Sequence, residues 1–174
     1  MEQGISRGRI SLRDYQRELA ERLRNADSAR AASKLGVQVG EQNWLIDLAE
    51  AGEVMPVPPI TPVPLTRPWF RGVANVRGNL YNVVDFAEFL GVGVSRGGEQ
   101  QRLVLLGERF RSAAALLVDR SLGLRNPTQL REREPASAAA SWLRAEHEDE
   151  DGGRWNELDV GALVRDAAFL AVGN

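Results

Sequence analysis

The chain has 174 residues, a net charge of −2 and 43% hydrophobic residues, enough to bury the core of one domain or of two small subdomains. It contains no cysteine, so disulfides, zinc fingers and thiol catalysis are excluded. The slightly acidic balance gives no reason to expect nucleic acid as a partner. No apolar run approaches the ~20 residues of a membrane span, so direct membrane insertion is not expected.

The N-terminal segment predicts a helix over residues 11–30. Residues Ser11 to Asp14 have the form of a capping box, with a serine at the N-cap and an acid three residues later. An apolar stripe at helical spacing follows, made of Leu12, Tyr15, Leu19, Leu23 and Ala26. This stripe either packs on its own domain or docks a partner. Since no basic segment leads into an apolar stretch at the start of the chain, we expect a cytoplasmic protein.

From Lys34 onward the hydrophobic period becomes that of β-strands. Apolar residues alternate over 34–39, a turn follows at 40–43, and 44–48 predicts a second strand. The segment 56–64 contains five prolines and predicts an extended edge or loop, because proline donates no ladder hydrogen bond. Residues 70–86 predict two short strands joined by a turn that contains Arg77 and Gly78.

The second half of the chain predicts further strands and two capped helices. Asp85 is the expected N-cap of a short helix that stops at Gly91, and a glycine-rich loop follows. Residues 102–107 and 110–119 predict a hairpin, 126–141 an irregular segment and 146–151 an exposed acidic loop, before a last helix capped by Asp159. The total of seven or eight short strands with peripheral helices predicts a mostly β, barrel-like fold.

Candidate catalytic groups are present but lack the required context. Residues Gly93 to Gly97 match the G-x-S-x-G pattern, and Ser95, Asp119 and His147 follow in the chain order of a hydrolase triad. However, a glycine-rich turn stands where the buried strand should be, and His147 lies in the acidic run. A small serine hydrolase is therefore the weaker alternative. The chain has no phosphate loop, and the acidic run has no glycine where an ion-binding loop would bend, so we expect neither cofactor nor metal.

The order and spacing of several motifs resemble the CheW-type coupling proteins of bacterial chemosensory systems. The resemblance runs from about Lys34 to Asp119 and more loosely to the C-terminus. The motifs are Glu53-Val54, Ile60–Pro64, Phe70–Gly78, Val84–Phe86 and Leu117–Asp119. The ending Trp155–Asp159 and the basic N-terminal helix are most similar to the PilI-like branch, which serves type IV pilus twitching motility.

The resemblance implies a fold and a function. It implies two small five-stranded SH3-like β-barrels on a shared core over 34–174, with 1–33 as a helical extension and a helical C-terminus. It further implies a non-enzymatic adaptor that bridges a methyl-accepting chemoreceptor-like protein and the regulatory domain of a histidine kinase, recruited to membrane-associated receptor arrays. The implied partner-binding residues are Glu53, Val54, Phe70, Asn75, Arg77 and Gly78, with an ion pair between Glu53 and Arg77.

Three alternatives stay open at the level of sequence. The Glu53–Arg77 pair can be structural, worth ~3–5 kcal/mol if buried, or a partner contact that contributes only ~0–1 kcal/mol to folding if exposed. The paired aromatics Trp69 and Phe70 belong either to the core or to an interface. The chain can also be a barrel module of a longer kinase, although its terminal helices favour a free-standing adaptor.

Overall fold

A computed structural model describes Glu21, residues 33–133 and residues 140–173 of the chain. The chain divides into two compact units, residues 1–31 and 32–174. The helix predicted over 11–30 falls in the first unit and lies outside the described residues, apart from Glu21, which is helical.

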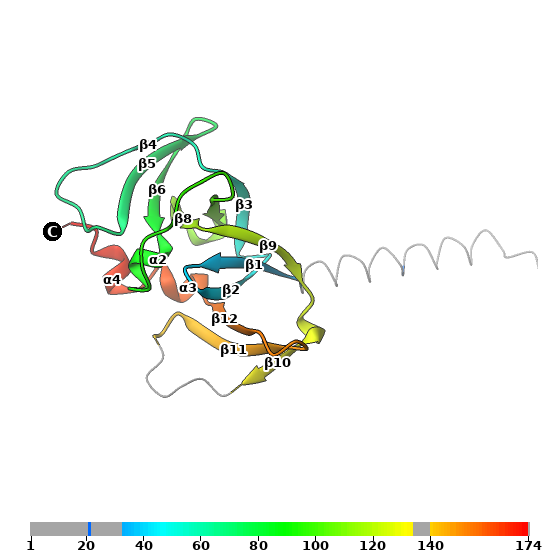
Figure 1. Cartoon of the computed structure of the whole chain (residues 1–174). Coiled ribbons are helices and arrows are strands. Elements are labelled where there is room, and N and C mark those ends of the chain that lie inside the picture. The colour runs from blue at the N-terminus through cyan, green and yellow to red at the C-terminus, as the bar shows by residue number, and fades with distance from the viewer. Residues whose placement is uncertain (1–20, 22–32, 134–139, 174) are drawn as a thin grey trace, which may run out of the picture. The chain divides into compact units, whose positions relative to one another are not determined.

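The second unit is built from two six-stranded sheets (Figure 1). We call the first the β1 sheet; in spatial order it comprises β10 (Leu130–Arg133), β11 (Leu143–Asp149), β12 (Arg154–Leu158), β2 (Gln42–Asp47), β1 (Lys34–Val39) and β9 (Arg120–Arg125). We call the second the β5 sheet; it comprises β3 (Ala51–Pro56), β7 (Arg102–Leu106), β8 (Ala114–Val118), β6 (Asn79–Asp85), β5 (Phe70–Val76) and β4 (Ile60–Thr61). Each sheet contains one parallel pair, β12 with β2 and β6 with β8, and the other pairs are antiparallel.

The predicted mostly β fold, with two β-sheet subdomains on a shared core, is confirmed, but the sheets have more strands than expected. Each has six strands where the resemblance implied five, and the twelve described strands exceed the seven or eight read from the sequence, because short edge strands such as β4 and β10 lay in segments predicted as loops. β4 has two residues within the proline-rich segment and lies at a sheet edge, as proline requires. β10 lies at another edge, inside the segment 126–141 that the sequence predicted to be irregular.

A single core joins the two sheets. Residues of β1 and β2, such as Val37 and Ile46, belong to the same buried cluster as Val104, Leu116 and Val118 of β7 and β8. A second cluster, which includes Leu103 and Leu117, fills the other side of β7 and β8. β8 is buried on both faces for this reason, which explains its unbroken apolar sequence.

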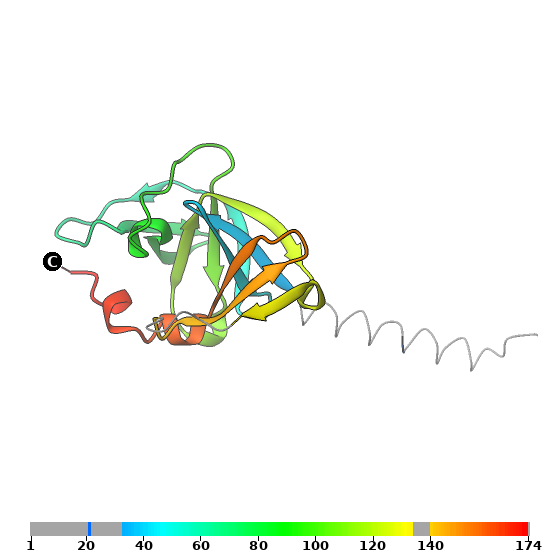
Figure 2. The same cartoon turned by 60° about the horizontal axis from the view of Figure 1, so that its bottom comes forward.

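Short helices connect the strands and close the core. They are α2 (Phe86–Phe89), α3 (Val160–Leu163), α4 (Ala167–Leu170) and the 3₁₀ turns η1 (Glu108–Phe110) and η2 (Pro127–Gln129). The predicted caps are confirmed: Asp85 accepts a hydrogen bond from Glu88 N–H, and Asp159 accepts one from Ala162 N–H. Figure 2 shows the helices of the C-terminal segment, coloured red and orange, beside the strands.

The acidic run 146–151 was predicted wrongly as a solvated loop. Most of it belongs to β11, which pairs with β10 and β12. The side chain of His147 is only 11% exposed, because the strand alternates and directs it toward the sheet interior. The hairpin turn at Asp151-Gly152, with Gly152 at φ 80°, connects β11 to β12. In the described part of the chain, no helix combines the length and the apolar character that crossing a membrane would take.

Candidate functional site

The hairpin of β5 and β6 places Arg77 at its tip. Val76 pairs with Asn79, so Arg77 and Gly78 form a two-residue turn, with φ angles of 52° and 88°. Positive φ at both positions is the geometry of a type I′ turn, which suits the right-handed twist of the strands. Gly78 adopts it freely, whereas arginine in the left-handed region carries a steric cost. Asn75 supports the turn, since its Oδ1 accepts the Gly78 N–H at 2.8 Å.

The predicted ion pair between Glu53 and Arg77 is formed. Both guanidinium Nη atoms donate to the two carboxylate oxygens at 2.7 Å, which is a bidentate pair. The Arg77 side chain is 74% exposed and that of Glu53 37% exposed. The pair therefore lies at the surface, where such pairs contribute ~0–1 kcal/mol to folding.

A β-bulge presents Glu53 to Arg77. β3 advances from Ala51 to Val54 while its partner β7 advances only from Leu106 to Val104, so β3 contains one extra residue in this interval. Bulges bend a strand and redirect its side chains. Glu53 lies in the bulge, and Val54 is half-buried against the shared core.

The six predicted partner-binding residues do not form one surface. Glu53, Asn75, Arg77 and Gly78 meet at the hairpin tip. Phe70 is only 8% exposed and belongs to the shared core, because it begins β5 on the inward face. Its neighbour Trp69 is half-buried and stacks on Phe169 with ring centroids 6.3 Å apart.

A hollow with a mixed polar and apolar lining follows the turn along β6. Its lining includes Leu80, Tyr81, Leu106 and Arg111, and its volume is about 310 Å³. Leu80 is 62% exposed. The hairpin thus presents an arginine and a leucine to solvent within four residues of each other.

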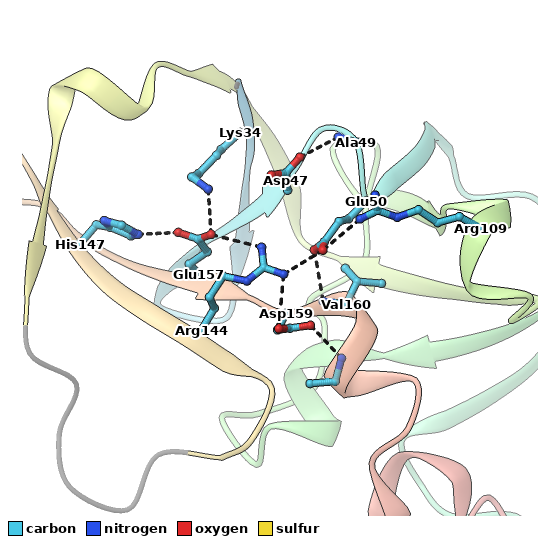
Figure 3. A network of polar contacts seen from close by, with 11 residues as sticks. Lys34, Asp47, Ala49, Glu50, Arg109, Arg144, His147, Glu157, Asp159 and Val160 are labelled. Carbon is cyan, nitrogen blue, oxygen red and sulfur yellow. Dashed lines mark hydrogen bonds and ion pairs between the residues drawn. The ribbon is translucent and has the colours of Figure 1, made fainter. Parts of the chain in front are cut away.

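A network of charged side chains around two buried carboxylates, which the sequence did not predict, extends from the β1 sheet to the β5 sheet (Figure 3). Glu50 is 6% exposed, and its Oε1 accepts from Arg144 Nη2 at 2.8 Å and lies 3.0 Å from Arg109 Nη2. Its Oε2 accepts the Val160 N–H at the start of α3, at 3.3 Å. Arginine and backbone donors together compensate the burial of this carboxylate.

Glu157 is the second buried carboxylate of the network. Lys34 Nζ lies 2.7 Å from its Oε1, and His147 Nε2 lies 2.6 Å from its Oε2. Burial acts to raise the pKa of Glu157, but hydrogen bonds from Lys34 and His147 outweigh burial, and its pKa lies below the ordinary value. Arg144 connects the two carboxylates, with Nη1 3.4 Å from Glu157 Oε1. Burial acts to lower the pKa of Arg144, and its hydrogen bond to Glu50 reverses this, so its pKa is raised.

Ser95, Asp119 and His147, the residues of the alternative hydrolase triad, form hydrogen bonds to other residues and not to one another. Ser95 Oγ donates to Asp85 at 2.9 Å, and its N–H also points to that carboxylate. Asp119 accepts backbone N–H groups of Gly40 and Arg96. With His147 bound to Glu157, none of the three forms the relay that a triad needs. Within the residues that the structure describes, no three acidic or histidine side chains gather as metal ligands.

Comparison with known proteins finds a matching family model and two related proteins. A family model described as CheW-like domain matches residues 34–168. The protein PilI of Pseudomonas aeruginosa is 34% identical over 100 residues, which cover 58% of this chain and 56% of PilI. The chemotaxis protein CheW of Thermotoga maritima is 29% identical over 104 residues, 60% of this chain and 68% of that protein. The alignment thus spans little more than half of PilI.

A solved structure shares the fold. The crystal structure of the scaffolding protein TtCheW from Thermoanaerobacter tengcongensis matches with a TM-score of 0.64. The match covers 79% of this chain and 95% of that protein at 16% identity.

Proposed function

Because the chain belongs to the CheW-like domain family, we propose that it is a non-enzymatic adaptor in a bacterial chemosensory pathway. It couples a methyl-accepting chemoreceptor-like protein to the regulatory domain of a histidine kinase. The similarity to PilI supports a role in type IV pilus twitching motility. The adaptor works in the cytoplasm at membrane-associated receptor arrays, where it binds other proteins.

The observation that carries this proposal is the exposed Glu53–Arg77 pair. An exposed ion pair contributes little to folding, and arginine at positive φ opposes it. A purely structural role would be served better by asparagine or glycine in a type I′ turn. The arginine is therefore best explained by a contact outside the chain. It presents guanidinium N–H groups to a partner while Glu53 holds it in one orientation.

We place the receptor contact at the hairpin tip of β5 and β6. Leu80 and the apolar part of the hollow beside it contact apolar side chains of a helical receptor tip, and Arg77 pairs with a carboxylate or carbonyl group of that tip. Arginine and tyrosine are enriched at interface hot spots, and Arg77 and Tyr81 supply both residue types here. The kinase regulatory domain docks at a separate barrel end, so the relative geometry of the docked parts carries the signal.

The two parts of the chain have separate roles in this proposal. Residues 34–174 form the adaptor domain, and residues 1–33 form a helical extension. Deletion of residues 1–30 is expected to leave a folded domain with a cooperative thermal transition. A molten product would show that the extension belongs to the core.

Reconstitution tests the proposal directly. The purified chain is mixed with the cytoplasmic tip of a candidate receptor and with the regulatory domain of the corresponding kinase, and the complexes are measured by calorimetry and size-exclusion chromatography. We expect each partner to bind alone and a ternary complex to form, since the sites are separate. Failure to bind either partner, or competition between the two, would contradict the bridging role.

A further inference from the structure

Glu50 stands at the junction between the two sheets. It lies between β2, the strand at which the chain leaves the β1 sheet, and β3, the strand at which it enters the β5 sheet. Its carboxylate contacts Arg144 on β11, in the β1 sheet, and Arg109 in η1, between two strands of the β5 sheet. One buried carboxylate therefore joins arginines that belong to both sheets, as Figure 3 shows.

The backbone of Glu50, like its side chain, is held by hydrogen bonds. Its carbonyl oxygen accepts the Gly107 N–H at 2.9 Å, which ties it to the end of β7. A Cβ atom at Gly107 would lie 3.0 Å from that oxygen, so glycine permits the close approach. The Glu50 N–H donates to the Asp47 carbonyl at 2.8 Å. The position of Glu50 is thus determined from both ends.

Glu50 lies three residues before Glu53, the acceptor of Arg77. The bulge of β3 begins at Ala51, directly after Glu50, and contains Glu53. Any shift of Glu50 relative to β7 changes the start of this bulge and hence the direction of the Glu53 carboxylate. A short covalent path therefore connects the buried network to the exposed pair.

We propose that Arg144 is a positioning residue: through Glu50 it fixes the orientation of the two sheets and sets the geometry of the Glu53–Arg77 pair. Arg144 is suited to this task, because it also contacts Glu157 and Asp159 at 3.4 Å and so links three carboxylates. Its planar fork bridges several acceptors at fixed angles, which a lysine ammonium does not do. The inference rests on the proposed adaptor function only where it concerns partner binding.

The effect of the Glu50–Arg144 pair on the orientation of the sheets can be measured separately from its effect on the stability of the fold. Replacing both members of a buried ion pair by apolar side chains costs less than removing one partner alone, and here Glu50 is buried while the Arg144 side chain is 34% exposed. The double variant Glu50→Met/Arg144→Met removes both members of this pair, although it also leaves the Val160 N–H and Arg109 without their Glu50 acceptor, so we expect it to fold with a lowered melting temperature. It should also lose the orientation that the charges impose, since methionine packs without directional contacts.

The absence of cysteine makes the orientation measurable by spin labelling. Labels at Asn79 and Ser121, both exposed, report the distance between the β5 and β1 sheets. Labels at Ser121 and Arg131, at opposite edges of the β1 sheet, report its internal geometry. Pulsed electron resonance gives both distance distributions in the full chain.

We expect the between-sheet distribution to broaden or shift in the double variant and in Arg144→Lys, while the within-sheet distribution stays as in the wild type. The control Arg133→Met removes an exposed ion pair with Glu148 and should change neither distribution. Binding to the receptor tip should weaken about tenfold in both network variants, as couplings between sites commonly do.

Unchanged between-sheet distances in both variants would overturn the inference, as would an equal change in the control. Failure of both variants to fold would also overturn it, because the network would then support the fold and not the orientation. If the wild type does not bind the receptor tip, the proposed function fails, and the distance measurements still decide the role of Arg144.

Discussion

Substitution of Arg77 separates a partner contact from a structural ion pair. The change Arg77→Asn removes the guanidinium and leaves a residue that adopts positive φ with little strain. Loss of the exposed bidentate pair costs up to ~1 kcal/mol. Relief of the left-handed arginine returns ~1 kcal/mol, since that conformation costs an ordinary residue ~1–2 kcal/mol. The net effect on unfolding free energy should lie within ~1 kcal/mol of zero.

This magnitude corresponds to a small change in melting temperature. For a chain of this size, 1 kcal/mol shifts Tm by ~2–4 °C, so we expect Arg77→Asn to melt within that range of the wild type. Arg77→Glu should melt slightly lower, because it keeps the strained backbone and faces Glu53 with a like charge. Both variants should lose receptor binding by at least about tenfold, which corresponds to ~1.4 kcal/mol.

The assay combines thermal melts by circular dichroism with calorimetry against the receptor tip. Arg96→Asn is the matched control, since Arg96 forms a 2.6 Å pair with Glu41 and its side chain is also 74% exposed. It should leave receptor binding unchanged. Wild-type affinity in both Arg77 variants would refute the partner role, and a fall in Tm of more than ~8 °C in Arg77→Asn would show instead that the pair supports the fold.

Three further outcomes can be checked on the isolated chain. Gly72→Ala should lower the free energy of unfolding by ~3 kcal/mol or more in chemical denaturation, because its Cβ would lie 2.1 Å from the Thr61 carbonyl oxygen. The control Gly78→Ala, whose Cβ would have no atom within 4 Å, should lower it by only ~1 kcal/mol. Similar losses in the two variants would contradict the clash at Gly72. Since the pKa of Glu157 is lowered in the folded chain, its carboxylate stabilises the fold above the ordinary value of 4.5 and that contribution is lost as pH falls through the folded pKa. Acid titration of unfolding free energy should therefore be flatter below pH 4.5 for Glu157→Gln than for the wild type, and parallel curves would argue against this origin. Ser95→Ala should lose ~1 kcal/mol of stability with receptor binding intact, and a fluorophosphonate probe should not label the wild type; covalent labelling at Ser95 would revive the hydrolase alternative.

The sequence predicted those elements whose cause is local. Alternation identified β1 and β2, and the turn residues Arg77 and Gly78 identified the β5–β6 hairpin. The acids at the helix starts, Asp85 and Asp159, were also recognised, because an N-cap depends only on neighbouring residues. The Glu53–Arg77 contact came from the family resemblance, since no local rule joins residues so far apart.

The elements that the sequence analysis missed depend on tertiary contacts, or on an alternation of inward and outward side chains that charged residues obscure. β11 reads as an acidic loop because its outward positions are charged, although Ala145 and His147 alternate inward. The Asp151-Gly152 dipeptide between two alternating runs was the available hairpin signal. The buried network had no sequence signal of its own, because Glu50 and Arg144 meet only once both sheets have formed.

The residues that stabilise the fold are buried, whereas the residues of the hairpin tip are exposed and contribute little to stability. An adaptor built this way can keep a rigid core while its surface residues change. The strands that carry the hairpin are anchored by Val76 and Val83, which are 5% and 0% exposed and lie in the second core cluster. The tip itself consists of exposed residues whose contributions to folding nearly cancel. A substitution at Arg77 or Leu80 is therefore expected to alter the proposed partner surface without threatening the core, whereas a change at the buried Glu50 is expected to move that surface. Variants selected for a new receptor should accordingly cluster at the tip, and those that change the coupling between partners should cluster around Glu50 and Arg144.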